Sequence, residues 1–243
     1  MNLAARLTAL KEQREGLSLS EQAKLVCKAA KEFEKSGEYE AAYEAVSDFW
    51  PDRTHEPVLD GLDDVNKAEV LLRVGSLAGW IGSTEQTPGS HEKAKDFITR
   101  SIELFEQLEL SDNVAEGRGE LALCYWREGS FDEARVNLNV ALQNASNENN
   151  ELRATLLIRA GIIEERTQRL QEALHYYYQA APLLEESDDH ALKGSFHSEF
   201  ALLFTRLGTE ESRRDYLDKA LIEATAASFH FRTGRKHALS RAR

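Results

Sequence analysis

The sequence has few of the residues that interrupt helices or join segments covalently. Among its 243 residues there are four prolines and two cysteines. Cys27 and Cys124 stand far apart and belong to no paired motif, which excludes a disulfide framework and a multi-cysteine zinc site. No stretch approaches the roughly 18 consecutive apolar residues of a membrane helix, and the polar first residues do not form a secretory signal. We therefore predict a cytoplasmic protein that does not enter a membrane.

Positive charge is also in short supply. The chain has 30 Lys and Arg residues against 42 Asp and Glu residues, which gives a formal net charge of −12. Because a surface of this sign repels phosphate backbones, nucleic acid is disfavoured as a partner. The exception is the segment 232–243, which lacks acidic residues and is interpreted either as a basic tail or as the opening of an incomplete further repeat. Its basic residues are Arg232, Arg235, Lys236, Arg241 and Arg243.

What the sequence does contain is the three- and four-residue apolar spacing of amphipathic helices, as at Leu121, Ala122 and Tyr125. Ser18 and Glu21 have the spacing of a capping box, in which a hydroxyl and a carboxylate satisfy free amide groups at a helix start. Helices of ordinary length would then fill nearly the whole chain as about ten or eleven elements. We predict an all-α protein.

The ends of these helices are expected at glycines and polar segments. Segment 51–62 contains two prolines and a glycine and predicts a linker, and the polar segment 82–90 predicts a loop. Further stops are expected where glycine interrupts the helical pattern, at Gly37, Gly129, Gly208 and Thr233-Gly234.

Internal repetition is the most informative feature. Small and large apolar residues recur with the same offsets in four stretches of the chain, and a fifth stretch, around Gly75, fits if seven residues are inserted between its two helices. The small residue in the middle of the first helix of each stretch is Ala30, Gly75, Ala122, Gly161 or Ala201. Small residues let two antiparallel helices approach, and the large ones fill the seam with the next pair. One pair alone cannot bury its apolar face, whereas stacked pairs can.

These residues resemble the tetratricopeptide repeat (TPR) family, and the resemblance covers residues 20–231. It implies a right-handed α-solenoid of about five helix pairs, preceded by an N-terminal helix and linker over 1–19. The spacing of the small residues is 39 to 47, against about 34 in the family. The longer repeats are similar to those of TPR arrays in bacterial signalling and regulatory proteins. A generic helical bundle is the alternative, and the periodic small residues count against it.

In the TPR family the first helix of each pair lines a concave groove, and carrying the family's ligand-contacting positions onto this chain gives a candidate binding surface. One such position, near the end of the first helix, carries four cations and an aromatic residue in an otherwise acidic protein. The candidates are Lys35, Trp80, Arg127, Arg166 and Arg206 at that position, Leu123, Ile162 and Leu202 on the expected floor, and Trp126.

The resemblance implies a non-catalytic scaffold or sensor that binds a protein or peptide of acidic and hydrophobic character, because arginine suits carboxylate capture. The competing explanation is that Lys and Arg end helices because they face the negative end of the helix dipole. An alternative function is that of a regulatory fragment of a larger bacterial signalling or transcription-regulator protein that lacks its effector domain. A homodimer through the C-terminal helix is a further expectation.

No catalytic motif or cofactor site is predicted. Phosphate-binding glycine loops and HExxH are absent from the sequence. The strongest enzymatic alternative is a metal site at His190, His197 and Glu199, which is disfavoured because no further ligand is in evidence.

Overall fold

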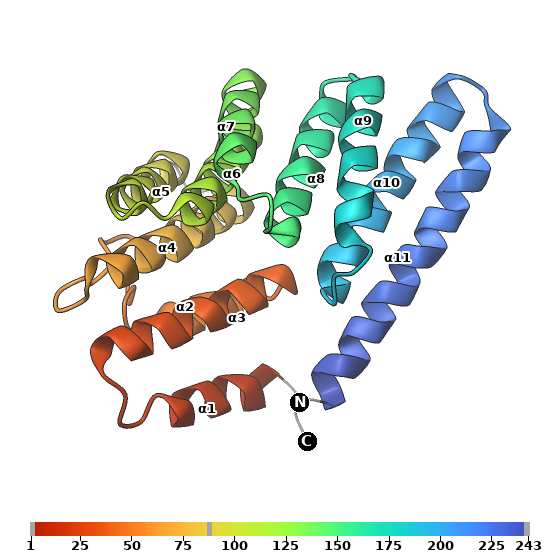
Figure 1. The fold of residues 1–243 in the computed structure, drawn as a ribbon. Coiled ribbons are helices and arrows are strands. Elements are labelled where there is room, and N and C mark those ends of the chain that lie inside the picture. Colours follow the sequence, from red (N-terminus) through yellow and green to blue (C-terminus); the bar gives the residue numbers. More distant parts are fainter. Residues whose placement is uncertain (1–2, 87–88, 241–243) are drawn as a thin grey trace. The chain divides into compact units, whose positions relative to one another are not determined.

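A computed structural model describes the backbone of residues 3–86 and 89–240 and the side chains up to Gly234, and every regular element in these residues is a helix (Figure 1). The all-α prediction is therefore confirmed. After α1, ten further α-helices follow in chain order among these residues, which is the number that five repeats of two helices would need. The elements are α1 (Leu3–Gln13), α2 (Leu19–Lys35), α3 (Tyr39–Val46), α4 (Asp64–Glu85), α5 (Ser90–Gln107), α6 (Ser111–Glu128), α7 (Phe131–Asn144), α8 (Asn150–Arg166), α9 (Leu170–Ala180), the 3₁₀ helix η1 (Ala181–Leu184), α10 (His190–Glu210) and α11 (Arg214–Ser240).

The chain divides into two compact units, Met1–Ser130 and Phe131–Arg243. The two helices of the third predicted pair, α6 and α7, thus belong to different units. None of the described helices has an apolar stretch long enough to span a bilayer.

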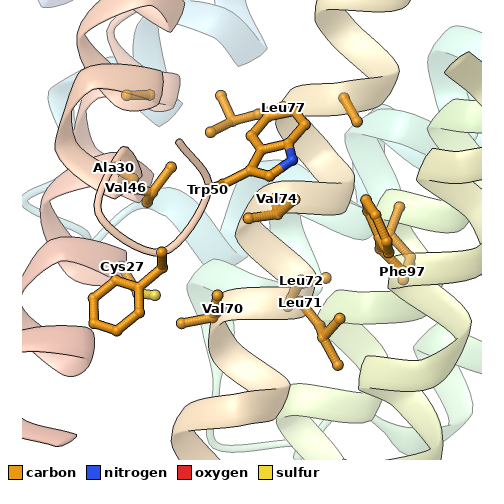
Figure 2. Packing of buried hydrophobic residues seen from close by; sticks show 14 of the residues in the cluster. Cys27, Ala30, Val46, Trp50, Val70, Leu71, Leu72, Val74, Leu77 and Phe97 are labelled. Carbon is orange, nitrogen blue, oxygen red and sulfur yellow. The ribbon is translucent and has the colours of Figure 1, made fainter. Parts of the chain in front are cut away.

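The core of the first unit lies where α2, α3 and α5 pack on α4. Trp50 follows α3 and is buried with Val74 and Leu77 of α4 (Figure 2). Its indole Nε1 donates a hydrogen bond to the carbonyl of His55, at 3.0 Å, within the predicted linker 51–62. Full burial of a large apolar side chain contributes about 2–3 kcal/mol. Trp50 therefore anchors the linker to the core.

The core of the second unit is rich in aromatic residues. Tyr177 of α9 lies between the helices α8 and α10, with its ring centroid 5.5 Å from that of Phe200 and 6.2 Å from that of Phe196. Phe204 stacks on Phe200 one turn further along α10, at 4.4 Å. Tyr177 is therefore a central packing residue of this core.

The recurring small residues lie where helices make their closest approach. A Cβ atom added to Gly75 would stand 2.6 Å from Ile98 Cγ1 of α5, and one added to Gly161 would stand 2.7 Å from Tyr177 Cε1 of α9. Ala30, Ala122 and Ala201 are buried. The physical reason given for the repeat, close approach of paired helices, is thus confirmed for the pairs α4/α5 and α8/α9.

Helix ends agree with the sequence only in part. The capping box of Ser18 and Glu21 forms at the start of α2. Gly37 and Gly129 adopt positive φ angles of 73° and 82° after α2 and α6, as expected of helix stops.

Cys27 and Cys124 are free, buried thiols.

Three predicted helix stops are wrong. At each of them the glycine allows a neighbouring side chain to pack closely, and the helix continues through it. Helix α10 runs through Gly208, where a Cβ would stand 2.7 Å from Leu217 Cδ2. Helix α11 runs through Thr233-Gly234, where Gly234 lies against His190. Helix α4 continues through Gly82, which leaves room for Ser90.

The predicted loop 82–90 is accordingly shorter than expected. Helix α4 ends at Glu85, its C-cap residue Gln86 takes the left-handed conformation with φ of 53°, and α5 begins at Ser90. Residues 87–88 of that segment lie outside the described residues.

Candidate binding surface on the first helices

In the first unit the predicted binding residues lie on α2, α4 and α6. Trp80 stacks on Tyr39 of α3, with ring centroids 3.9 Å apart and an angle of 11° between the planes, so one face of its indole is covered. Leu123, Trp126 and Arg127, from the last turns of α6, are each partly exposed. This surface combines aromatic and apolar atoms with a cation, which is the composition of a peptide-contacting surface.

Arg127 keeps its charge available. Within the described residues its guanidinium forms no ion pair or hydrogen bond. Its Nη1 lies over α4, 3.5 Å from the place that a Cβ of Gly79 would occupy. Gly79 therefore leaves room for the arginine next to Trp80. Lys35, at the end of α2, is exposed and lies 4.0 Å from Glu32.

In the second unit the predicted residues lie on α8 and α10. Leu202 is 49% exposed, and Ile162 is partly buried against the aromatic core. Arg166 ends α8, is exposed, and forms no hydrogen bond or ion pair with the described part of the chain. Like Arg127, it remains available to a ligand.

Arg206 has a different environment. Its Nη1 donates to the Glu165 carbonyl at 2.9 Å and to Glu165 Oε1 at 3.1 Å, and its Nη2 donates to Gln168 Oε1 at 2.8 Å. A guanidinium that satisfies a free carbonyl in the last turn of a helix stabilises that helix end. Arg206 thus joins α10 to the end of α8, and its donors are largely used within the unit.

A half-buried carboxyl completes this part of the surface. Burial and the neighbouring charge of Glu165 raise the pKa of Glu199, whereas Arg166 acts in the opposite direction. The same three charges surround the hydroxyl of Tyr177, which is buried and has no hydrogen-bond partner in the described structure.

The sequence analysis did not find the buried ionic network that joins the first helices of unit 1. Arg73 of α4 is only 2% exposed. Its Nη1 donates to Glu34 Oε2 of α2 at 3.1 Å, and its Nη2 donates to Glu116 Oε1 of α6 at 2.5 Å. Glu116 also accepts a hydrogen bond from Lys31. One guanidinium therefore links three helices through charge-assisted hydrogen bonds.

Two further carboxylates make the network acidic. Ser76 Oγ lies 2.7 Å from Glu120 Oε2 and 3.3 Å from Glu34 Oε2. A hydroxyl has one proton and can donate to only one of these carboxyl groups. Glu69 of α4 accepts a hydrogen bond from the side-chain amide of Asn113 of α6. Four carboxyl groups thus surround the two cations, Arg73 and Lys31. This excess of acidic groups favours the protonated, neutral form of one of the carboxyl groups.

Glu34 is the carboxyl group that the surroundings neutralise. Its pKa is raised to about 7, chiefly by burial and also by the charges of Glu120 and Glu116. Together these effects outweigh the charge of Arg73, which lowers the pKa. Burial also acts to raise the pKa of Glu116, but Arg73 and Lys31 prevail there and the pKa of Glu116 is lowered. The network therefore favours the ionised form of Glu116 and the protonated form of Glu34.

One signal in the sequence could have pointed to this network. Arg73 is the one charged residue within the apolar stretch 70–79 of α4, and a cation there must find carboxylates when the helix is buried. Its partners come from two other repeats, and single-sequence periodicity does not show which residues face each other.

In the described structure, the residues of the disfavoured metal alternative, His190, His197 and Glu199, have other neighbours. His197 Nδ1 lies 2.6 Å from Glu223 Oε2 of α11, and its ring stacks on His230 at 5.3 Å. His190 Nδ1 lies 3.0 Å from His230 Nδ1. Glu199 interacts instead with the charges of Glu165 and Arg166, and all three act on the hydroxyl of Tyr177. No group of three or more metal-ligating side chains occurs among the described residues.

Comparisons with known proteins show the fold. No protein-family model matches the sequence, and no curated protein matches it. Among solved structures, the chain is similar to a Rap protein complexed with competence and sporulation factor, with a TM-score of 0.66 and 15% identity. That match covers 90% of this chain, which spans only 58% of the Rap chain.

Two further structures match over most of both chains. The apo form of RapI has a TM-score of 0.54 and 16% identity, and the match covers 97% of this chain and 93% of RapI. BtubC from P. vanneervenii has a TM-score of 0.57 and 13% identity, with 93% and 89% covered. Together with the helix pairs described above, these likenesses show that the chain has the all-α, helical-repeat fold of TPR-like proteins.

Proposed function

We propose that this chain is a non-catalytic cytoplasmic binding protein, which holds a segment of another protein against the first helices of its repeats. The observation that carries the proposal is the difference between the arginines of these helices. Arg73 and Arg206 are used inside their units, whereas Arg127 and Arg166 form no ion pair with the described residues.

The surroundings of the two available arginines define the chemistry of the partner. Partly exposed Leu123 and Trp126 lie in the same turns of α6 as Arg127, and Leu202 is exposed on α10 of the other unit. Apolar atoms beside an arginine suit a segment in which acidic side chains alternate with hydrophobic ones. The Rap protein that shares the fold was solved with a bound factor, which supports a binding role for this fold.

The buried network around Arg73 holds three first helices of the first unit, α2, α4 and α6, in a fixed arrangement. Three first helices that are tied together by one guanidinium present their outer residues in a constant arrangement, and a preorganised surface loses less entropy on binding. In this proposal the network supports α6, and Arg127 on α6 makes the contact with the partner.

The proposal is tested by selecting ligands from a random-peptide display library on the purified protein. The wild type is expected to enrich peptides that combine Asp or Glu with Leu, Phe or Trp. In Arg127→Glu/Arg166→Glu, affinity for the selected peptides is expected to fall at least tenfold, since the attractive contact of a peptide with either arginine becomes repulsive, whichever unit it binds. The melting temperature is expected to fall by only a few degrees, because neither arginine has an ion pair to lose and the only charge effect is the loss of the Arg166 cation near Glu165 and Glu199.

A matched control is Lys28→Glu, which reverses an exposed cation of α2 and is expected to bind the selected peptides like the wild type. If the double reversal binds as tightly as Lys28→Glu, the two arginines are present only because of the helix dipole and the proposed surface is wrong.

A further inference from the structure

The face of α11 that points away from α10 carries large, exposed apolar side chains over about two helical turns. Tyr216, Ala220 and Ala227 are buried on the side facing α10. On the opposite side, large apolar side chains remain uncovered: Leu221 is 69% exposed, Ile222 65% and Phe229 61%. Large apolar side chains that are exposed together on one face of a helix mark an interaction surface.

Residues on this face mirror one another about Thr225. Asp218 lies seven residues before Thr225, and Arg232 lies seven residues after it. Leu221 and Phe229 lie four residues before and after it. At 100° per residue, all four point within about 40° of the direction of Thr225. The face is therefore self-complementary when one copy of the helix is reversed.

We propose that this face binds the same face of a second copy of the chain, with the two α11 helices antiparallel and Thr225 on the two-fold axis. In that register Asp218 meets Arg232 of the partner subunit, and the symmetry repeats this ion pair at the other end of the interface. Leu221 meets Phe229 of the partner subunit, again twice. A parallel pairing would place Asp218 against Asp218 and Arg232 against Arg232, so charge selects the antiparallel, isologous arrangement.

The charged ends of the face are free for this pairing. Asp218 and Arg232 are exposed, and neither forms an ion pair with the side chains that the structure describes. The surface is also hollowed beside the two-fold position, in a depression lined by Ala224, Thr225, Ser228, Phe229, Arg232 and Thr233. A side chain such as Leu221 of the partner subunit has space to enter there.

Charge reversal and charge exchange test the register. By sedimentation velocity of the full chain, the wild type is expected to be a dimer at micromolar concentration. Asp218→Arg and Arg232→Asp are each expected to raise the dissociation constant roughly tenfold or more, since each puts like charges together twice. The combined variant Asp218→Arg/Arg232→Asp is expected to restore the dimer. Glu186→Arg, an exposed acid outside α11, is the matched control and is expected to leave the dimer unchanged.

Covalent trapping gives a second readout that does not depend on affinity. In Thr225→Cys the two-fold axis brings the new thiols together, so mild oxidation is expected to yield a disulfide-linked dimer. Background is low because Cys27 and Cys124 are buried. Glu186→Cys is expected to remain monomeric on denaturing gels. A wild-type chain that stays monomeric at all concentrations, or single reversals that leave the dimer intact, would overturn the proposal. Peptide selection by Arg127 and Arg166 is measured separately and is unaffected by either result.

Discussion

Arg73 Nη1 lies 3.1 Å from Glu34 Oε2, and this ion pair joins the first helices of two successive repeats inside the first unit. Because the same guanidinium also binds Glu116, one side chain holds together the three first helices α2, α4 and α6. A charge buried to this extent is tolerated only while its partners are in place. The stability of the unit should therefore respond sharply to the loss of Arg73.

Arg73→Met keeps much of the volume of the side chain and leaves Glu34 and Glu116 without their cation. We expect unfolding by urea to show a loss of roughly 3–5 kcal/mol. Arg100→Met is the matched control, because Arg100 also contacts two carboxylates, Glu56 and Asp96, but at the surface. It should cost less than about 1 kcal/mol. Equal effects of the two substitutions would contradict the structural role of the buried network.

Glu34→Gln tests the protonation state of the network. The pKa of Glu34 is raised to about 7 in the folded protein, above its ordinary value of 4.5. Between these two values the folded state binds more protons than the unfolded state, so the contribution of Glu34 to stability is complete below pH 4.5 and declines as the pH rises toward 7. The melting temperature of the wild type minus that of Glu34→Gln should therefore fall between pH 5 and pH 8. A constant or rising difference would show that Glu34 stays ionised.

Tyr177→Phe tests the unpartnered hydroxyl in the second unit. The Tyr177 oxygen is buried and forms no hydrogen bond in the described structure. Removing a buried hydroxyl that has no partner relieves its desolvation cost, so we expect a gain of up to about 1 kcal/mol in the free energy of unfolding. Tyr43→Phe is the control, since the Tyr43 hydroxyl donates to the Pro51 carbonyl and should give no gain. A clear loss in Tyr177→Phe would mean that the hydroxyl has a partner.

The histidines between α10 and α11 should make this contact sensitive to acid. Burial lowers the pKa of His230, and the charges of His197, His190 and Lys193 lower it further. Below pH 6.5 the unfolded state therefore binds the additional proton first, and the stabilising contribution of neutral His230 is lost as the pH falls through its lowered pKa. Amide hydrogen exchange in α11 should accelerate between pH 7 and pH 5, after correction for intrinsic rates, and less so in His230→Gln. Identical acid responses of the two proteins would contradict this assignment.

The fold could be predicted from the sequence because its cause is local and repeated. Gly75 and Gly161 sit at equivalent positions of their repeats, and each leaves room for a side chain of the paired helix, Ile98 or Tyr177. A small residue at a fixed offset can be read from one sequence. The same reasoning erred at Gly208, since a glycine needed for contact with Leu217 looks identical to one that ends a helix.

The candidate site could be predicted less well, because it depends on contacts between repeats. The sequence places Arg127, Arg166 and Arg206 at the ends of first helices, but only the coordinates show that Arg206 is bound to Glu165 while the other two are free of partners in the described chain. Likewise, Arg73 meets Glu34 and Glu116 across separations of 39 and 43 residues, which periodicity does not constrain.

The most direct test of the account is to ask which helices touch a bound peptide. A photoreactive amino acid would replace Leu202, exposed on the first helix α10, or Val136, which is 61% exposed on the second helix α7. With a peptide selected on the wild type, illumination should cross-link at position 202 and not at position 136. Cross-linking at position 136 alone would place the peptide on the second helices and contradict binding on the first-helix surface.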